Sequence, residues 1–273
     1  MKLLAFSDLH TDLGQAQRLA ERATQADVVV GVGDFASVHS GLTETIETLR
    51  AIEVPAVLVP GNNETEDALR DACAGWKRAV VLHGDATEID GVAFFGLGAG
   101  VPVTPWDWSF DLTEEAATEL LEGCPEGCVL AVHSPPHGHV DVSGSGEHLG
   151  SEAVLRTIET RRPRLALCGH IHESWGRQSR IGPTQVINLG PEGMLLEGCP
   201  EGCVLAVHSP PRGHVDVSGS GKHLGSEAVL RTIESRRPRL ALCGHIHESW
   251  GKQSRIGPTR VINLGPEGML LEV

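Results

Sequence analysis

The segment Lys2-Leu3-Leu4-Ala5-Phe6-Ser7-Asp8-Leu9-His10 joins a short apolar run directly to an aspartate and a histidine. A run of this length followed by polar residues predicts a buried strand that ends in a loop. Loops at one edge of a sheet bring together residues that are far apart in the sequence. We therefore expect Asp8 and His10 to belong to a functional site at a sheet edge.

Four further segments repeat this arrangement. Each follows a short apolar run and carries polar side chains of metal-ligating type, in the order Gly33-Asp34, Gly61-Asn62-Asn63-Glu64, His133-Ser134-Pro135 and Gly169-His170-Ile171-His172. Carboxylate, imidazole and amide oxygen ligands together suit Mn, Fe, Zn or similar divalent ions, and one aspartate can bridge two of them. The five segments therefore predict a binuclear metal site.

The rest of the amino-terminal half alternates between apolar runs of strand length and stretches with helical spacing. Helices are expected near residues 13–23, 41–51 and 64–73, and short strands follow from Val80 onward. A last hairpin is expected from residues 184–189 and 194–197. The alternation predicts an α/β fold.

The order Asp-x-His, Gly-Asp, Gly-Asn-x-Glu, His, Gly-His-x-His resembles the calcineurin-like metallophosphoesterase superfamily over residues 1–197. Residues 104–111, expected to form a loop over the cleft, and His133-Ser134-Pro135-Pro136 are similar to segments of its small bacterial single-domain members. The resemblance implies two packed mixed β-sheets flanked by helices. It also implies a hydrolase that cleaves a small phosphomonoester or phosphodiester with a hydroxide bridging two metals.

The resemblance assigns roles to individual side chains. One metal would be held by Asp8, His10 and His172, the other by Asn62, His133 and His170, and Asp34 would bridge both. The ions would be manganese first, with iron, zinc, nickel or magnesium as alternatives. The residues expected to act in catalysis are Asp34, Asn62, Asn63 and His133.

Asn63 departs from the family pattern. The family usually has histidine at this position, where it helps to protonate the leaving oxygen. An asparagine amide carries no titratable proton at neutral pH. We therefore expect a preference for leaving groups that need little protonation, such as aryl or cyclic nucleotide phosphodiesters, with Asn63 able to orient the phosphate by hydrogen bonding.

Composition limits the class of partner. The formal net charge is -14 and the pI is near 5.4, so no broad basic surface is available for long nucleic acid. A small phosphorylated substrate stays compatible with this charge, because bound cations reverse the local potential. No apolar run reaches membrane-spanning length, and the first is too short for a signal peptide. We expect a cytoplasmic protein.

Residues 123–197 recur as residues 198–272, here called copy one and copy two. The two copies differ at only five positions, which are His137/Arg212, Glu147/Lys222, Thr160/Ser235, Arg177/Lys252 and Gln185/Arg260. The expected division is a metallophosphoesterase domain at 1–197 and a surplus half-domain at 198–273. Copy two repeats three histidines of the site as His208, His245 and His247.

Only one complete site can form per chain, because Asp8, His10, Asp34 and Asn62 occur once. Docking of copy two would loop out copy one at a closure cost of about 2–4 kcal/mol. We therefore expect copy one to supply the ligands, with copy two as the alternative. The unpartnered copy would expose strand edges, which recruit other chains. A homo-oligomer could form through this copy. The alternative hypothesis for the function is a catalytically weak or inactive metal-binding scaffold that self-associates in this way.

Overall fold

In the computed structural model, the described residues are 1–197, 203–266 and 269. They divide into two compact units, Met1–Glu197 and Gly198–Val273. Residues 198–202, which include the expected start of the surplus half-domain, lie outside the described residues. Among the described residues, no helix is both long and apolar enough to cross a membrane.

The first sheet of unit 1 has five strands in the order β11-β1-β2-β3-β4. Strands β1 to β4 are parallel, and β11 runs antiparallel to β1. Asp12 caps α1 by accepting a hydrogen bond from the backbone N–H of Gln15. The elements of this layer are β1 (Lys2–Phe6), α1 (Leu13–Arg22), a 3₁₀ turn (Ala23–Gln25), β2 (Val28–Val32), α2 (Leu42–Leu49), β3 (Ala56–Val59), α3 (Glu66–Ala72), β4 (Ala79–Val81) and β11 (Met194–Glu197).

The second sheet has six strands in the order β5-β6-β7-β8-β10-β9, with antiparallel edge strands β5 and β9. Strands β6, β7, β8 and β10 are parallel. The elements of this layer are β5 (Asp85–Ile89), β6 (Val92–Leu97), α4 (Glu114–Leu121), β7 (Val129–Val132), α5 (Glu152–Arg161), β8 (Leu165–Cys168), a 3₁₀ turn (His172–Ser174), β9 (Gln178–Ile181) and β10 (Thr184–Asn188).

The core of unit 1 has three layers of apolar contact. One cluster packs helices α1 to α3 on the first sheet, and a second packs α4 and α5 on the other sheet. Between the sheets lies a third cluster, which includes Val30, Val57, Ala131 and Leu167. Strand β2 is buried along its whole length because both its faces are covered, which explains its run of valines. The predicted α/β fold with mixed sheets flanked by helices is confirmed.

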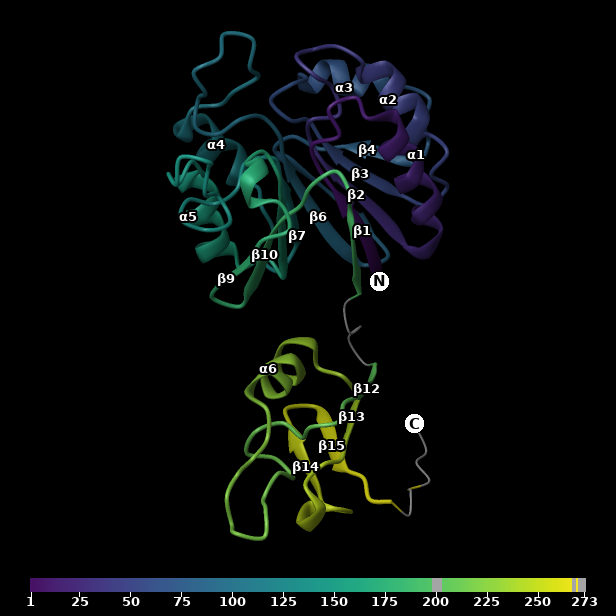
Figure 1. Ribbon diagram of the computed structural model, residues 1–273, viewed down its shortest axis with the longest axis vertical. Helices are drawn as coiled ribbons and strands as arrows, with labels where there is room; N and C mark the ends of the chain where they lie inside the picture. Colours follow the sequence, from purple (N-terminus) through teal and green to yellow (C-terminus); the bar gives the residue numbers. More distant parts are fainter. Residues whose placement is uncertain (198–202, 267–268, 270–273) are drawn as a thin grey trace. The chain divides into compact units, whose positions relative to one another are not determined.

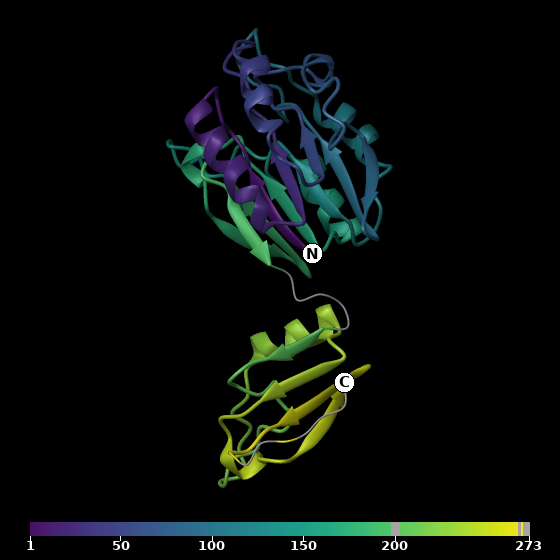
Figure 2. The same cartoon turned by 90° about the vertical axis from the view of Figure 1, so that its right-hand side faces the viewer.

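The expected hairpin of residues 184–189 and 194–197 is wrong. Strand β10 pairs with β8 and β9, whereas β11 crosses to the other sheet and pairs with β1. Figure 2 shows β11 in light green beside the purple elements at the start of the chain. The physical reason is that a short apolar strand can be buried by either sheet, and sequence proximity does not decide which.

Unit 2 repeats the last part of unit 1. Its sheet has the order β12-β13-β15-β14, with the same parallel and antiparallel pairings as β7-β8-β10-β9. A smaller apolar cluster that includes Ile233, Ala241 and Val261 stabilises this unit. Its elements are β12 (Val204–Ala206), α6 (Glu227–Arg236), β13 (Leu240–Cys243), a 3₁₀ turn (His247–Ser249), β14 (Gln253–Ile256) and β15 (Thr259–Asn263).

Candidate metal centre

The candidate ligands of unit 1 follow the carboxyl ends of five strands. Strands β1, β2 and β3 are parallel neighbours in one sheet, and β7 and β8 are parallel neighbours in the other. Because parallel strands end at the same edge, the loops after them converge. The residues delivered in this way are Asp8 and His10 after β1, Asp34 after β2, Asn62 after β3, His133 after β7, and His170 and His172 after β8.

The first cluster contains Asp8, His10 and His172. One ligand atom from each lies within 4.8 Å of the other two. The Nε2 atoms of His10 and His172 are 3.1 Å apart, and Nε2 of His172 is 3.7 Å from Oδ1 of Asp8. Two ring nitrogens and a carboxylate oxygen therefore face a common point.

The second cluster contains Asp34, His133 and His170, and Asn62 joins it. The Oδ1 atom of Asn62 is 3.2 Å from Nε2 of His133 and 3.2 Å from Nδ1 of His170. Nδ1 of His133 lies 2.8 Å from the Val32 carbonyl oxygen and donates its proton there. The lone pair on Nε2 of His133 is therefore free to bind a cation.

Asp34 lies between the two clusters. Its Oδ2 atom is 3.6 Å from Nε2 of His10, which belongs to the first cluster. Its Oδ1 atom is 3.5 Å from Nε2 of His133, which belongs to the second. One carboxylate therefore reaches both groups of ligands, as a bridging aspartate must.

The spacing of the donor atoms fits metal ions. Neighbouring ligands that each lie about 2.1 Å from one ion are about 3.0–3.4 Å from one another in octahedral or tetrahedral geometry. The pairs measured in these clusters are 3.1 to 3.7 Å apart. The donor set of imidazole, carboxylate and amide oxygen also has the composition that borderline divalent cations take. The residues present therefore fit a pair of such ions.

The backbone at the centre is strained. Asp8, His10, Asp34 and His170 have φ values of 55°, 44°, 59° and 67°, in the left-handed region that non-glycine residues rarely adopt. Conformations of this kind cost about 1–3 kcal/mol each and persist where surrounding structure holds them. Four of the seven candidate ligands are thus held in an unfavourable backbone conformation.

Gly61 allows two of the ligand loops to approach each other. A Cβ atom added at this position would lie 2.0 Å from Oδ1 of Asp34 and 2.2 Å from its backbone nitrogen. No larger residue fits there without displacing Asp34. The glycine before Asn62 is therefore required by the packing of the site.

The electrostatics favour cation binding. Burial lowers the pKa of the His170 imidazole well below its usual range, and the neighbouring His133 and His172 lower it further. Burial also lowers the pKa of His10. Burial raises the pKa of the Asp34 carboxyl well above its usual range, and the nearby Asp8 adds to this shift. The lowered pKa values favour the neutral form of His10 and His170, which is the form that binds a metal, and a cation would offset the cost of the buried Asp34 carboxylate.

Glu64 is a buried carboxyl group that positions the loops. It accepts hydrogen bonds from the backbone N–H groups of Asp34 (2.8 Å), Ala36 (2.9 Å) and Gly61 (2.7 Å). Burial raises its pKa to about 7, and the neighbouring Asp34 contributes to the shift. Glu64 therefore ties the loop after β2 to the loop after β3. The sequence shows Glu64 as part of its motif, but no spacing rule reveals this contact.

Asn63 contacts Asp34. Its Nδ2 group donates to Oδ2 of Asp34 at 2.7 Å, and its backbone N–H donates to Oδ1 at 2.9 Å. Its Oδ1 atom accepts from the backbone N–H of Val38 at 2.8 Å. Both ends of the amide are therefore engaged within the protein. The sequence predicted a role toward the phosphate or its leaving group, which stays a prediction, and the structure adds a role in holding the carboxylate of Asp34.

Trp175 and Ser7 hold Asp8 in place. The indole Nε1 of Trp175 donates to Oδ2 of Asp8 at 3.0 Å, and the hydroxyl group of Ser7 donates to the same oxygen. The Trp175 ring also lies 4.3 Å, centroid to centroid, from the His172 ring. These contacts leave Oδ1 of Asp8 directed at the first cluster. The role of Trp175 was not predicted from the sequence, where its position three residues after His172 is the only signal.

Copy two repeats the histidines but not their surroundings. Nε2 of His208 is 3.1 Å from Nδ1 of His245, and both side chains are exposed, as is that of His247. Within the described residues, both groups of convergent carboxylate and histidine ligands lie in unit 1. The geometry therefore favours copy one as the source of ligands, and copy two remains the alternative.

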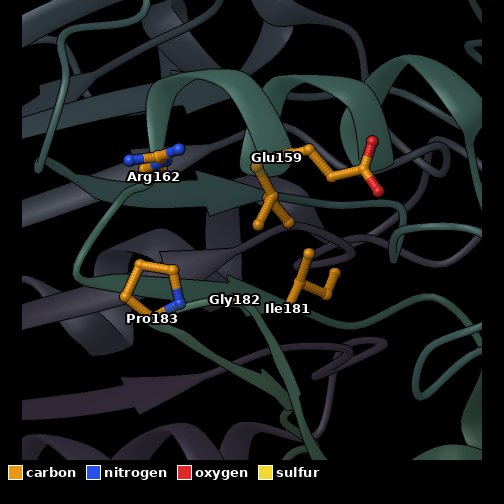
Figure 3. A pocket seen from close by; sticks show the side chains of 6 residues that line it. Glu159, Arg162, Ile181, Gly182 and Pro183 are labelled. Carbon is orange, nitrogen blue, oxygen red and sulfur yellow. The ribbon is translucent and has the colours of Figure 1, made fainter.

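A distinct pocket lies away from this centre. It has a volume of about 300 Å³ and is formed at the end of α5 and the turn between β9 and β10. Figure 3 shows Glu159 and Arg162 above Ile181 and Pro183. No metal-ligating cluster lies among its lining residues, so the chemistry is expected at the strand ends instead.

Comparison with known proteins identifies relatives of this chain. The calcineurin-like phosphoesterase superfamily domain matches residues 1–210. The UPF0046 protein T07D4.2 of Caenorhabditis elegans is 33% identical over 120 residues, which are 40% of this chain and 28% of that protein. A second UPF0046 protein of this organism, K07C11.7, is 28% identical over 210 residues, or 69% of each chain. This chain thus covers less than a third of the length of the first relative.

A solved structure has a similar fold. The crystal structure of a dimetal phosphatase from Danio rerio superposes with a TM-score of 0.50 at 14% identity, and the match covers 70% of this chain and 88% of that one. At this level of identity the likeness concerns the fold alone.

Proposed function

We propose that this chain, which belongs to the calcineurin-like phosphoesterase superfamily, hydrolyses a small phosphomonoester or phosphodiester at a binuclear metal site in unit 1. The observation that carries this proposal is the position of Asp34, whose two oxygens lie 3.6 Å from His10 and 3.5 Å from His133. A single carboxylate between two ligand clusters is the arrangement that a pair of cations requires.

Two divalent cations, manganese first, would supply Lewis acidity toward phosphoryl oxygens and lower the pKa of a coordinated water. The residues of this chain prepare the place for them. Asp8, His10 and His172 would hold one cation, and Asn62, His133 and His170 the other. Glu64 fixes the loop that carries Asp34 by accepting from its backbone N–H. Asn63 fixes the carboxylate of Asp34 by donating to it. Trp175 fixes Asp8 in the same way.

The substrate class follows from charge and from Asn63. A net charge of -14 disfavours long nucleic acid, whereas a small phosphorylated molecule is compatible with cations at the site. Membership of the calcineurin-like phosphoesterase superfamily supports a phosphoester substrate. Asn63 cannot donate a titratable proton, so aryl and cyclic nucleotide esters should be hydrolysed faster than alkyl esters.

A second candidate function is a metal-binding scaffold with little turnover that associates through copy two. The observation in its favour is the exposed edge strand β12 of unit 2. Val204 is 40% exposed, whereas its counterpart Val129 is 2% exposed because the first sheet covers it. An exposed edge strand can recruit another copy of the chain.

Hydrolysis of an aryl phosphodiester, bis(4-nitrophenyl) phosphate, with added Mn²⁺ distinguishes the two functions. The enzyme proposal expects metal-dependent turnover that Asp34→Ala abolishes. Asp71→Ala, which removes an exposed carboxylate of α3, is the matched control and should keep its activity. Metal binding without hydrolysis across a broad panel of phosphoesters, together with concentration-dependent association, would favour the scaffold.

A further inference from the structure

The loop of residues 104–111 contacts a candidate metal ligand directly. The backbone N–H of Phe110 donates to the carbonyl oxygen of Asn62 at 2.9 Å. The side-chain Nδ2 of Asn62 donates to the hydroxyl oxygen of Ser109, also at 2.9 Å. The main chain and the side chain of Asn62 are therefore both attached to this loop.

The single hydroxyl proton of Ser109 determines which group donates in each of these hydrogen bonds. Ser109 has one hydroxyl proton, and its Oγ lies 2.6 Å from Oδ1 of Asp111, which can only accept when ionised. The Ser109 hydroxyl must therefore donate to Asp111 and accept from Asn62. Only the amide nitrogen of Asn62 can supply that proton. The amide oxygen of Asn62 is consequently turned the other way, toward His133 and His170.

Asp111 is itself held firmly. The backbone N–H and the hydroxyl group of Thr104 both donate to its Oδ2 atom at 2.7 Å. Gly100 lies against Oδ1, where an added Cβ atom would be 2.3 Å away. Backbone hydrogen bonds from Gly100 to Phe110 and from Leu112 to Gly100, each 2.9 Å, close the base of the loop. The orientation of Asp111 thus does not depend on Asn62.

We infer that Asp111, acting through Ser109, is a positioning residue that fixes the amide of Asn62 with its oxygen toward the second metal position. The inference rests on the proposed binuclear site. A carboxamide turned by 180° would present its NH₂ group, which carries partial positive charge and no free lone pair, to a cation. Partners that orient a ligand typically change metal affinity 10–100-fold when they are removed.

The inference predicts an effect at one metal position only. Ser109 contacts Asn62, which belongs to the second cluster, and Asp111 acts on Asn62 only through Ser109. Asp8 of the first cluster is held instead by Ser7 and Trp175. Loss of the Ser109 hydroxyl should therefore weaken one of two metal equivalents about 10-fold or more and leave the other within about twofold.

The test is titration calorimetry with Mn²⁺ on the full chain after its metals are removed with a chelator. Ser109→Ala and Asp111→Asn should each weaken one equivalent, and Ser109→Thr, which keeps the hydroxyl, should restore it. Asp107→Asn removes a charge from an exposed position on the same loop and is the matched control. Thermal unfolding of the metal-free variants checks that each is folded. If Ser109→Ala does not fold, the conservative Asp111→Asn tests the inference instead.

Unchanged affinity for both equivalents in Ser109→Ala and Asp111→Asn would overturn the inference. An equal loss of Mn²⁺ affinity in Asp107→Asn would overturn the inference too, because the effect would then come from removing a negative charge on the loop. Hydrolysis is measured separately. If the wild type binds two Mn²⁺ ions without hydrolysing any phosphoester, the proposed function fails while the binding result for Asn62 stands.

Discussion

Asp34 lies between the two ligand clusters of the site. Its carboxylate is 2% exposed, accepts two hydrogen bonds from Asn63 and lies within 3.6 Å of a histidine from each cluster. A buried carboxylate is costly unless it is paired. Asn63 supplies hydrogen bonds, and burial lowers the pKa of the neighbouring His10, which favours its uncharged form. A bound cation would supply the missing positive charge.

Glu64 should make the stability of the metal-free protein depend on pH. Its pKa in the folded protein is about 7, above the ordinary value of 4.5, so the folded state binds a proton more tightly than the unfolded state. The stability that this proton contributes is present below about pH 4.5 and is lost as the pH rises through 7, at up to about 1.4 kcal/mol per unit. Urea unfolding of the wild type and of Glu64→Gln, measured from pH 5 to 8, should show the wild type losing stability relative to the variant. If the free energy of unfolding changed equally with pH in the wild type and in Glu64→Gln, the raised pKa of Glu64 would be contradicted.

Asn63→His tests the expected bias in leaving groups. A histidine provides a titratable proton near the reacting phosphate, so hydrolysis of alkyl esters should rise relative to aryl esters. The metal content should change less than this ratio. The ratio of kcat/KM for matched alkyl and aryl phosphodiesters is the measurement. A variant that lost a metal while its substrate ratio stayed the same would show that Asn63 acts only by holding Asp34.

At the scale of elements, the strand ends and the loops after them build the centre. Gly61→Ala should disrupt it, because the new Cβ would lie 2.0 Å from Oδ1 of Asp34. We expect a loss of about 1–3 kcal/mol in stability and a large loss of metal affinity. Gly123→Ala, where the nearest side-chain atom would be 3.6 Å away, is the control. Thermal unfolding and Mn²⁺ titration of both variants are the measurements. Equal stability and equal Mn²⁺ affinity of the two variants would contradict this prediction.

The sequence predicts these strand ends well because each combines two independent signals. An apolar run indicates a buried strand, and a polar ligand directly after it indicates the loop, so the placement of Asp8, Asp34 and His170 follows from local pattern. The contacts of Trp175 with Asp8 and of Ser109 with Asn62 could not be predicted. They join residues 167 and 47 positions apart through side-chain directions that no spacing encodes. The pairing of β11 with β1 could not be predicted either, because a short apolar strand can be buried by either sheet.

At the scale of the whole molecule, the chain carries one amino-terminal half and two copies of the carboxy-terminal half. In the structure, copy one completes the first unit, since its β11 pairs with β1 and its β7 pairs with β6. Copy two forms a sheet of its own with exposed histidines. The repeated sequence therefore does not imply a second site.

Paired substitutions distinguish the two copies. His133→Ala with His172→Ala should reduce kcat/KM at least about 100-fold, because ligands of both clusters are lost. The equivalent change in copy two, His208→Ala with His247→Ala, is the matched control and should keep most of the activity. The reverse result would mean that copy two docks on the amino-terminal half, at a closure cost of about 2–4 kcal/mol.

The most direct test of the account is the number of metal ions per chain, measured on fully loaded protein for the full chain and for a chain that ends at Glu197. We predict two equivalents of Mn²⁺ in both, because Asp8, His10, Asp34 and Asn62 occur once and copy one supplies the remaining ligands. About four equivalents in the full chain would contradict it. So would a folded 1–197 chain that binds none.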